Sequence, residues 1–426
     1  MKRSIVFPVL LFLGLAPAVL HAEEAVSWRG CVMEARARHP DLASSRALLR
    51  QAEAERLLAG STLLPSLGVT GSVTTGGTVG SGASGASSLF SYSVTARQLL
   101  YDGRKNSKLR DASAESVKAR ESSMAGVSAD VRFVLRSAFT ELLKAQEMVE
   151  LSSDIALRRK NNARLIALRY RAGREHIGSL RRAEADLAAA EFEVAQASRG
   201  LVLARCVLSS ALGRRERSPL RVAGSFTAPV PETRLAPDFQ AIARRNPLVV
   251  ELEAVRNAAG YSLAAAESAF APELYLRSSA GRSETSDWPP ENVSLHAGVE
   301  LVVPIYEGGA GRARVAGARA ALSGKDAAVE SGMLQVLDLL EASWKQFVDA
   351  RERLTVQKKY LDAAVERSSI ADAQYSNGLI SFDDWVIIED NLVSAKKEFL
   401  NAGGNLWIAE AQWIQAKGGG LDEVVD

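Results

Sequence analysis

The residues that could carry out chemistry in this chain are few and lie far apart. Histidine is the side chain that most often binds metals and moves protons near neutral pH, but no two histidines have the spacing of a metal site. The four are His21, His39, His176 and His296. The Gly-Ala-Gly sequence that begins at Gly309 could open a dinucleotide-binding turn, yet Arg314 stands where the third glycine belongs. No Gly-Lys-Ser or Gly-Lys-Thr occurs in the chain. The sequence therefore predicts no enzyme, no cofactor and no metal site.

The N-terminal segment indicates export. Lys2 and Arg3 precede an apolar run from Ile5 to Leu20, and small and polar residues follow, which is the pattern of a cleaved secretory signal peptide. We expect the signal peptide to cover 1–22 and the mature chain to begin near Glu23. A membrane anchor is the alternative, but the run is short for about 30 Å of hydrocarbon and contains two prolines. No cysteine stands at the expected cut, so no lipid anchor is expected.

The net charge and the two cysteines limit which partners the chain can bind and which disulfides it can form. The sequence has 52 basic and 50 acidic residues, and the expected signal peptide removes two basic ones. A balanced chain creates no global field that attracts nucleic acid, so we expect no nucleic-acid partner. Cys31 and Cys206 could form one disulfide in an exported protein or remain free thiols, and the sequence leaves both open.

The chain contains an internal duplication, because four motifs return in the same order about 205 residues later. The pairs are His39-Pro40 and Asn246-Pro247, Leu64-Pro65 and Ala271-Pro272, Leu100-Tyr101-Asp102-Gly103 and Ile305-Tyr306-Glu307-Gly308, and Tyr170-Arg171-Ala172-Gly173 and Tyr375-Ser376-Asn377-Gly378. We expect a first repeat over 23–218, a linker over 219–236, a second repeat over 237–418 and a tail over 419–426.

Each repeat should contain a pair of very long helices. No proline occurs between Pro65 and Pro219 or after Pro304, and these stretches are rich in good helix formers. Apolar residues recur by sevens from Val131 and from Leu135, which is the period of a left-handed supercoil. The longer helix of each pair could reach on the order of 100 Å. The expected helices are 106–171 and 180–212, then 311–377 and 385–416, with turns at about 170–180 and 375–385.

The segments before each long helix alternate like strands. Phe90, Tyr92 and Val94 are separated by hydroxyl residues, which is typical of a strand with one apolar and one polar face. Two strand hairpins are expected, at about 66–100 and 273–305. Such strands suit either a membrane barrel or a soluble sheet. Four strands cannot close a barrel, which needs about eight, and an open sheet in lipid leaves backbone groups unpaired. A membrane role would therefore need several copies, and three would supply twelve strands.

In this order, and twice over, these motifs resemble the TolC family of outer-membrane efflux and secretion channels, across essentially the whole mature chain. The resemblance implies an α+β membrane protein with a duplicated helix-strand-strand-helix unit. Its homotrimer would form a 12-stranded outer-membrane β-barrel, in contact with lipid, continuous with a long periplasmic α-helical coiled-coil barrel. The implied function is a passive exit duct of a tripartite efflux or type I secretion system. A periplasmic adaptor (membrane fusion) protein and an inner-membrane transporter of the RND, ABC or MFS type would recruit and open it.

The resemblance also assigns a role to an acidic pair. In the family, acidic residues just after Tyr-x-x-Gly of the second repeat line the periplasmic aperture, and the matching residues are Asp383 and Asp384. A threefold ring of carboxylates would bias the aperture toward cations. Alternatively, the two residues cap the following helix, where aspartate interacts well with the helix dipole, and both readings can hold together.

The first repeat departs from the pattern of the family. It has a serine where the second repeat has Asp384, and Arg174, Arg181 and Arg182 lie nearby. Our hypothesis is that these arginines pair with Asp383 or Asp384 and act as an aperture latch. The alternative is a solvated basic tip.

The turns are also the expected docking site for the adaptor. The residues that match are Gly173 in the first repeat and Gly378, Leu379 and Ser381 in the second. The glycines could instead serve only as helix ends with positive φ. For the whole chain, the alternative to a channel is a periplasmic coiled-coil structural or adaptor protein that stays outside the membrane.

Overall fold

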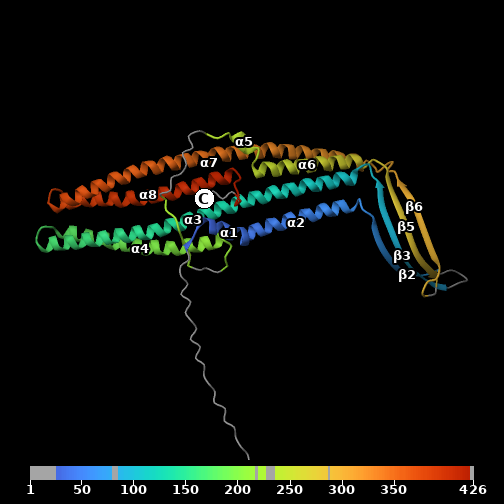
Figure 1. Cartoon of the computed structure of the whole chain (residues 1–426), viewed down its shortest axis with the longest axis horizontal. Coiled ribbons are helices and arrows are strands. Elements are labelled where there is room, and N and C mark those ends of the chain that lie inside the picture. Colours follow the sequence, from blue (N-terminus) through green and yellow to red (C-terminus); the bar gives the residue numbers. More distant parts are fainter. Residues whose placement is uncertain (1–24, 79–84, 216–218, 227–235, 286–287, 423–426) are drawn as a thin grey trace, which may run out of the picture.

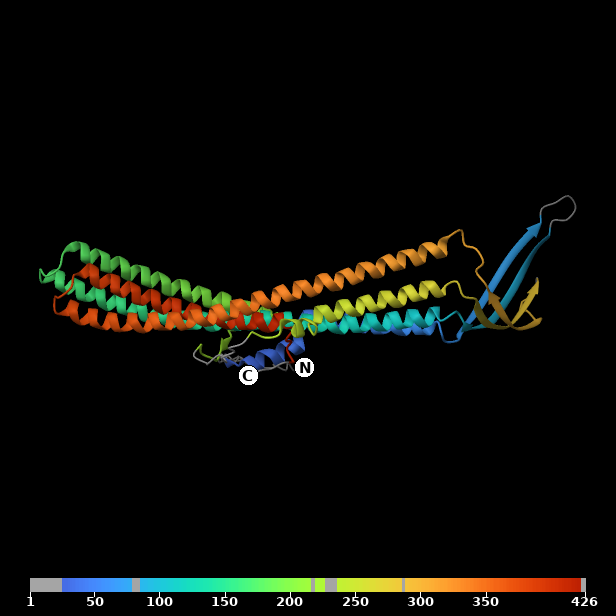
Figure 2. The same ribbon diagram turned by 90° about the horizontal axis from the view of Figure 1, so that it is seen from above.

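The protein is an elongated rod of long helices with a twisted sheet at one end (Figure 1, Figure 2). The computed structural model describes residues 25–78, 85–215, 219–226, 236–285 and 288–422. The expected signal peptide lies outside the described residues. Within them, no helix combines the length and the apolar character that a membrane crossing requires.

The duplication is visible in the lengths of the helices, because each helix of the first repeat has a partner of equal length in the second. The pairs are α2 (Pro40–Ser61) and α6 (Pro247–Ser268) with 22 residues, α3 (Lys105–Arg171) and α7 (Ala310–Ser376) with 67, and α4 (Ile177–Ala211) and α8 (Phe382–Ala416) with 35. The long helices therefore lie where the proline-free stretches predict them. The shorter helices α4 and α8 begin three residues earlier than expected.

The His-Pro and Asn-Pro motifs begin the paired helices α2 and α6. Nδ1 of His39 accepts a hydrogen bond from the backbone N–H of Asp41, and the side chain of Asn246 does the same for Leu248 at 2.9 Å. Proline then occupies the first helical position, where no N–H is needed. One cap and one proline thus fix the start of each helix.

A small group of elements surrounds the middle of the rod. It consists of β1 (Ala25–Val26), α1 (Trp28–Arg38), β4 (Arg221–Val222) and α5 (Phe239–Ala243). Strands β1 and β4 pair in parallel, so part of the segment expected to be a linker, 219–236, joins the fold instead. Both cysteines are free thiols, and burial raises the pKa of the Cys31 thiol to about 12.

The largest apolar core lies in the same middle region. Leu135 and Leu142 are fully buried, and Val131 and Ala138 are nearly so, as the sevenfold period predicts. Trp28 and Trp407 pack against this cluster from α1 and α8. The core therefore joins both repeats rather than filling one of them.

The sheet joins the repeats at the far end. Its order is β2 (Ser66–Thr78), β3 (Gly85–Tyr101), β5 (Glu273–Thr285) and β6 (Val293–Val302), all antiparallel. The strands extend further toward their connecting loops than the alternation alone predicts. In the single chain the sheet is open, with β2 and β6 at its edges, and the expected 12-stranded barrel is not formed by one copy.

The two faces of the sheet differ as the alternation predicts. One face carries exposed apolar side chains, among them Leu67, Val69 and Leu295. The other carries hydroxyls, and the side chains of Ser72 and Ser91 meet across β2 and β3 at 2.8 Å. Each strand therefore separates an apolar surface from a polar one.

The turn glycines at the two sheet-to-helix junctions offer a matched test of packing. Gly103 and Gly308 occupy equivalent positions with φ of 66° and 62°, but a Cβ on Gly103 would stand 2.3 Å from Cβ of Ala271, whereas one on Gly308 meets nothing within 4 Å. Alanine at a positive φ costs about 1–2 kcal/mol, and forced overpacking adds about 1–3 kcal/mol. Gly103→Ala should therefore lower the thermal unfolding midpoint, followed by circular dichroism in detergent, clearly more than Gly308→Ala. Equal shifts would contradict this packing.

Candidate functional site

The two helical turns lie together at the end of the rod opposite the sheet (Figure 1, Figure 2). Gly173 and Gly378 end α3 and α7 with φ of 68° and 75°. The next residue in each turn donates its N–H back into the helix, from Arg174 to the carbonyl of Arg169 and from Leu379 to that of Gln374, both at 2.9 Å. Both glycines are thus helix ends of the kind that needs a residue without a side chain.

Polar side chains begin the return helices. Nδ1 of His176 accepts hydrogen bonds from the backbone N–H groups of Gly178 and Ser179, and Oγ of Ser381 accepts one from Asp384 at 3.1 Å. These caps explain why α4 and α8 start earlier than predicted, because a capped helix begins directly after its capping residue.

Tyr375 joins the two turns. It is buried, stacks on Trp385 with ring centroids 4.6 Å apart, and donates a hydrogen bond from its hydroxyl to Oε2 of Glu175 at 3.0 Å. Burial and this hydrogen bond raise the pKa of Tyr375 to about 12. The guanidinium of Arg169 lies 4.4 Å from the tyrosine ring and donates to the carbonyls of Tyr375 and Ser376. Each hairpin therefore completes the turn of the other.

The equivalent tyrosine of the first repeat, Tyr170, is 40% exposed. Tyr375 is 2% exposed. The duplicated motif therefore has a linking role only in the second repeat, and the two turns are not interchangeable.

A buried ion pair holds the hairpins together further from the turns. One guanidinium nitrogen of Arg158 on α3 donates to both carboxylate oxygens of Glu389 on α8 at 2.9 Å, and the Glu389 side chain is only 3% exposed. Oγ of Ser368 donates to the same carboxylate at 2.5 Å. Trp385 donates from its indole nitrogen to Asp372 at 2.8 Å, and Arg158 also reaches Asp372. The carboxylate of Glu389 is thus well satisfied although it is buried.

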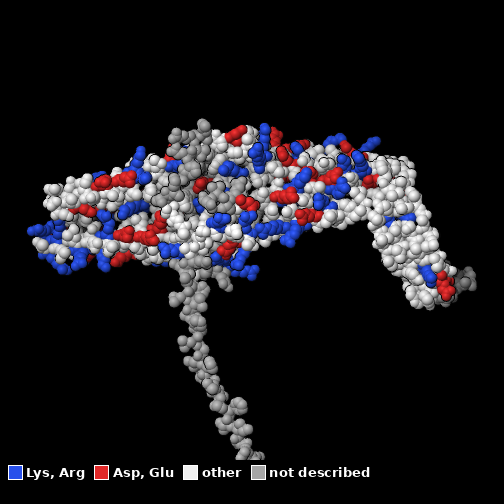
Figure 3. All heavy atoms as spheres, in the orientation of Figure 1, with Lys and Arg blue, Asp and Glu red and all other residues white. Residues whose placement is uncertain are grey.

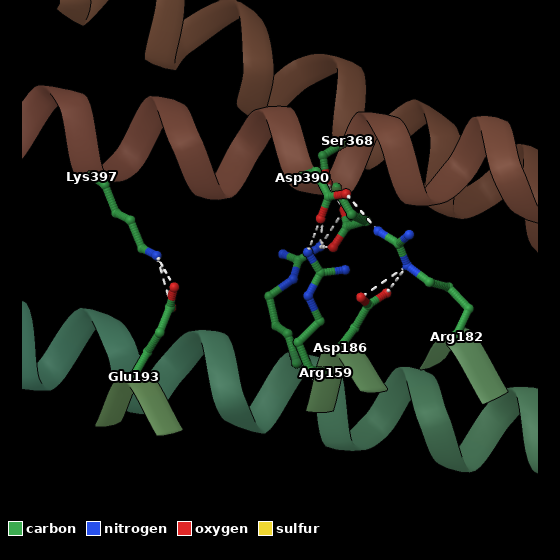
Figure 4. A network of polar contacts seen from close by, with 9 residues as sticks. Arg159, Arg182, Asp186, Glu193, Ser368, Asp390 and Lys397 are labelled. Atoms are coloured by element: carbon green, nitrogen blue, oxygen red, sulfur yellow. Dashed lines mark hydrogen bonds and ion pairs between the residues drawn. The ribbon is translucent and has the colours of Figure 1, made fainter. Parts of the chain in front are cut away.

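Further ion pairs join the hairpins on either side of this one (Figure 4). Arg159 reaches Asp390 at 2.5 Å, and Lys397 reaches Glu193 at 2.7 Å. Arg182 pairs mainly with Asp186 on its own helix and lies 3.7 Å from Asp390 across the hairpins. Side chains from both helices of the first hairpin, α3 and α4, thus pair with α8 of the second hairpin at several points along their length.

The predicted aperture residues Asp383 and Asp384 lie side by side and exposed in the first turn of α8. Asp384 also accepts a hydrogen bond from the hydroxyl of Ser381 at 2.7 Å, so it takes part in the cap. The capping residue of α8 is therefore Ser381 and neither aspartate, although both lie in the first turn, where a negative charge suits the helix dipole. Both carboxylates remain at the surface of the tip.

The structure brings only one of the three predicted latch arginines near this acidic pair. Arg181 pairs with Glu184 of its own helix, and Arg174 is exposed and has no ion-pair partner within the described part of the chain. The pKa of Arg182 is raised first by its hydrogen bond to Asp186, and to a smaller degree by the charges of Asp390 and Asp383. Asp383 therefore lies within electrostatic range of Arg182 across the hairpins, without a direct contact.

The tip of the first hairpin is strongly basic (Figure 3). Its exposed cations include Arg164, Arg171, Arg174 and Arg181. The predicted docking residues Gly173, Gly378, Leu379 and Ser381 are exposed around the two turns, and Leu379 is 72% exposed. No side chains cover these turns within the described residues, so both are accessible from the end of the rod.

The sequence did not reveal the residues that hold the hairpins together. Tyr375 was visible as part of Tyr-x-x-Gly, but its link to Glu175 joins residues 200 positions apart. Arg158 and Glu389 are 231 positions apart and resemble any other charged residues of a solvated helix. The periodic pattern of α8 could have placed Glu389 on the buried face of this helix. It could not have identified Arg158 as the partner of Glu389.

No group of three or more histidine, cysteine, aspartate or glutamate side chains in the described part of the chain could hold a metal ion. The tips of the two hairpins carry exposed charged residues, and contacts through Tyr375, Glu175 and Arg169 hold the two hairpins together. The fold is that of an elongated α-helical and β-sheet protein, with exposed charged residues at the end of the rod opposite the sheet as well as along its length (Figure 3).

The chain belongs to the outer membrane efflux protein family, whose model matches residues 31–214 and 239–419. It is similar to the outer membrane efflux protein BepC of Brucella suis, with 23% identity over 74% of this chain and 72% of BepC. It is also similar to the cobalt-zinc-cadmium resistance protein CzcC of Cupriavidus metallidurans, with 25% identity over 72% of each chain. The solved structure of CusC matches the fold with a TM-score of 0.83 at 18% identity, covering 93% of this chain and 95% of CusC. The protein is therefore an outer-membrane channel protein of the TolC type that extends into the periplasm.

The buried ion pair offers a test of what joins the hairpins. Glu389→Ala leaves Arg158 without its main partner, and we expect a loss of roughly 3 kcal/mol, the lower part of the range for broken buried pairs because the guanidinium is 40% exposed. Glu193→Ala removes the more exposed pair with Lys397 and should cost about 0–1 kcal/mol. Hydrogen exchange of the α8 amides near each site reports the local opening energy. Comparable losses at the two sites would show that burial of Glu389 contributes little.

Proposed function

We propose that three copies of this chain form a passive exit duct through the outer membrane. The observation that carries the proposal is the open sheet with an apolar face and two unpaired edges. In lipid, each unpaired backbone group costs several kcal/mol, so a spanning sheet has to close. Three copies with β2 beside the neighbour's β6 would make a closed barrel of twelve strands, which supports a trimer.

The helices carry a matching pair of edges. In the half of the rod near the turns, the helices follow the order α4, α3, α8, α7, so α4 and α7 lie at the outside. Each carries a line of exposed apolar side chains: Phe192, Val202 and Leu203 on α4, and Val356, Tyr360 and Ile370 on α7. Packing α4 of one copy against α7 of the next would bury both lines and repeat around a closed ring. The same trimer would then enclose a channel along the whole rod.

We assign the repeats 23–218 and 237–418 as the two units of each subunit, and the tips of their hairpins as the periplasmic aperture. Three copies of Asp383 and Asp384 would place six carboxylates around one axis, which favours the entry of cations. This charge arrangement needs no catalytic group, and it fits a duct through which cargo passes without chemical change.

The accessible turns suit docking of a periplasmic adaptor. Gly173 and Gly378 expose backbone at the extreme end of the rod, and Leu379 and Ser381 lie beside them. An adaptor bound there, together with an inner-membrane transporter of the RND, ABC or MFS type, would make a tripartite efflux or type I secretion system. The relative CzcC bears the name of a cobalt-zinc-cadmium resistance protein. Efflux of metal ions is therefore one function included in the proposal.

The assembly is tested by native mass spectrometry of protein extracted with detergent from isolated outer membranes. The expected result is a trimer. A monomer or dimer would leave the apolar face and both sheet edges without a partner, and it would overturn the duct in favour of a coiled-coil structural protein.

Opening of the aperture is tested through the basic tip. We propose that Arg181 and Arg182, with Arg174, hold Asp383 and Asp384 in a latch, partly between neighbouring copies. Arg181→Ser with Arg182→Ser should raise the resting single-channel conductance in planar bilayers. Exposed pairs are worth only about 0–1 kcal/mol each, but threefold repetition multiplies the effect. The control, Lys160→Ser with Arg120→Ser, removes the same charge from exposed positions of α3 outside the tip and should leave the conductance unchanged. Equal conductance in both double variants and the wild type would eliminate the latch.

A further inference from the structure

The strands carry few charged residues, and their placement is uneven. Strand β2 has none and β3 has only Arg97, while the remainder lie on β5 and β6. Figure 3 shows the sheet as mostly uncharged, with one group of basic atoms near its junction with the helices and a mixed group near its far end. Charges on a sheet that borders lipid need a reason, because they are costly unless they face water.

The register shows which charges share a face. Arg97 on β3 is the direct cross-strand partner of Arg277 on β5, and Tyr275 is the partner of Glu300 on β6. All four belong to the same face as Ser91 and the other hydroxyl residues, because side chains alternate along each strand. Arg282 belongs to the opposite face, where its cross-strand partner is Tyr92.

Arg277 and Lys105, two cations on the polar face of the sheet near its junction with the helices, are neutralised. Arg277 forms an ion pair with Glu300. Lys105, the first residue of α3, lies 2.5 Å from Glu273, and the hydroxyl of Tyr275 donates to the same carboxylate at 2.7 Å. These two pairs account for both carboxylates on this part of the polar face.

Arg97 is the remaining cation. Its guanidinium lies 4.0 Å from the centre of the Tyr275 ring, and no carboxylate in the described part of the chain stands within 4.0 Å of it. Like charges directly opposite each other destabilise a sheet, so the pairing of Arg97 with Arg277 is a local cost. Stacking on Tyr275 fixes the position of the guanidinium without cancelling its charge.

The cations border a hollow on the polar face. It has a volume of about 590 Å³, and its lining includes Thr95, Arg97, Arg277, Ser279 and Glu300. A guanidinium beside hydroxyl groups suits a carboxylate or phosphate, because its planar donors match two oxygens of either group and the hydroxyls can donate as well.

We propose that Arg97 forms an anion-selective ring inside the sheet end of the channel. The proposal rests on the trimeric duct, in which the polar face lines the water-filled interior and three Arg97 guanidinium groups surround one axis. The ring favours small anions that carry carboxylate or phosphate groups. It acts independently of Asp383 and Asp384, because α3, with 67 residues, spans roughly 100 Å between the two ends and the screening length is about 10 Å at 0.1 M salt.

The test is the reversal potential of single channels in a potassium chloride gradient at low salt. Asp383→Asn with Asp384→Asn serves as the background, so that the acidic aperture does not mask the ring. In this background, Arg97→Gln should lower the chloride-to-potassium permeability ratio by at least about twofold, since fields focused in a narrow channel change local ion concentrations strongly. Arg97→Lys keeps the charge and should keep most of the preference.

Two further variants separate charge from folding. Ser66 is the cross-strand partner of Arg97 on β2, so Ser66→Glu supplies a carboxylate to the intact arginine and should lower the ratio as Arg97→Gln does. Arg282→Gln removes the same charge from the opposite, apolar face and should leave the ratio unchanged. A fall in both Arg97→Gln and Arg282→Gln would show a general charge effect and overturn the ring.

The outcomes also distinguish this inference from the proposed duct. If no trimers and no channels form in any variant or in the wild type, the duct itself is wrong. If channels form and their permeability ratio does not respond to Arg97→Gln or to Ser66→Glu, the ring is wrong and the duct stands. If neither variant assembles, the test is the channel that carries only Asp383→Asn and Asp384→Asn. A chloride-to-potassium permeability ratio below one for this channel at low salt would overturn the ring.

Discussion

The structure depends on one constraint, which is that backbone N–H and C=O groups in lipid have to find partners within the protein. The four-stranded sheet pairs its inner edges through β3 and β5, the strands that come from different repeats. Its outer edges on β2 and β6 would pair with neighbouring copies in the proposed trimer. In the proposed trimer a single chain cannot complete the barrel, because its sheet has only four strands. The duplication supplies two equivalent hairpins, and their pairing through β3 and β5 makes one segment of the proposed ring.

The same constraint extends into the helices. Each strand hairpin continues into helices on both sides, so in the proposed trimer the helices would follow the same circular order as the strands. The exposed apolar lines on α4 and α7 lie at the outer edges of this order, just as β2 and β6 do in the sheet. The central core, which includes Leu135 and Leu142, lies where α3 and α8 meet the elements around the middle of the rod. The apolar lines proposed to contact neighbouring copies are thus separate from the buried core of the single chain.

Much of this arrangement could be predicted from local signals. The absence of proline marks the stretches that contain the long helices, alternation marks the strands, and the equal lengths of α3 and α7 follow from the duplication. The predicted starts of α4 and α8 lie three residues too late, because the local pattern does not identify His176 and Ser381 as the capping residues. The links between the hairpins could not be predicted, because Arg158 and Glu389 meet only after both hairpins have formed. The partner of Arg182 could not be predicted either, because it depends on which carboxylate lies nearest in the folded protein. Arg182 pairs with Asp186 of its own helix and not with Asp383.

The links between the hairpins differ in how easily they can be rearranged. The pair of Arg158 and Glu389 combines a buried carboxylate with several donors, so separating it would expose an unsatisfied charge to a dry environment. Closer to the turns, Arg181 and Arg182 are exposed and can exchange one carboxylate for another at little cost. In the proposed aperture, a widening movement would therefore begin among the exposed side chains at the turns, before the Arg158 and Glu389 pair separates. Tyr375 lies at the turns themselves, and its hydrogen bond to Glu175 is a buried contact that such a movement would have to break.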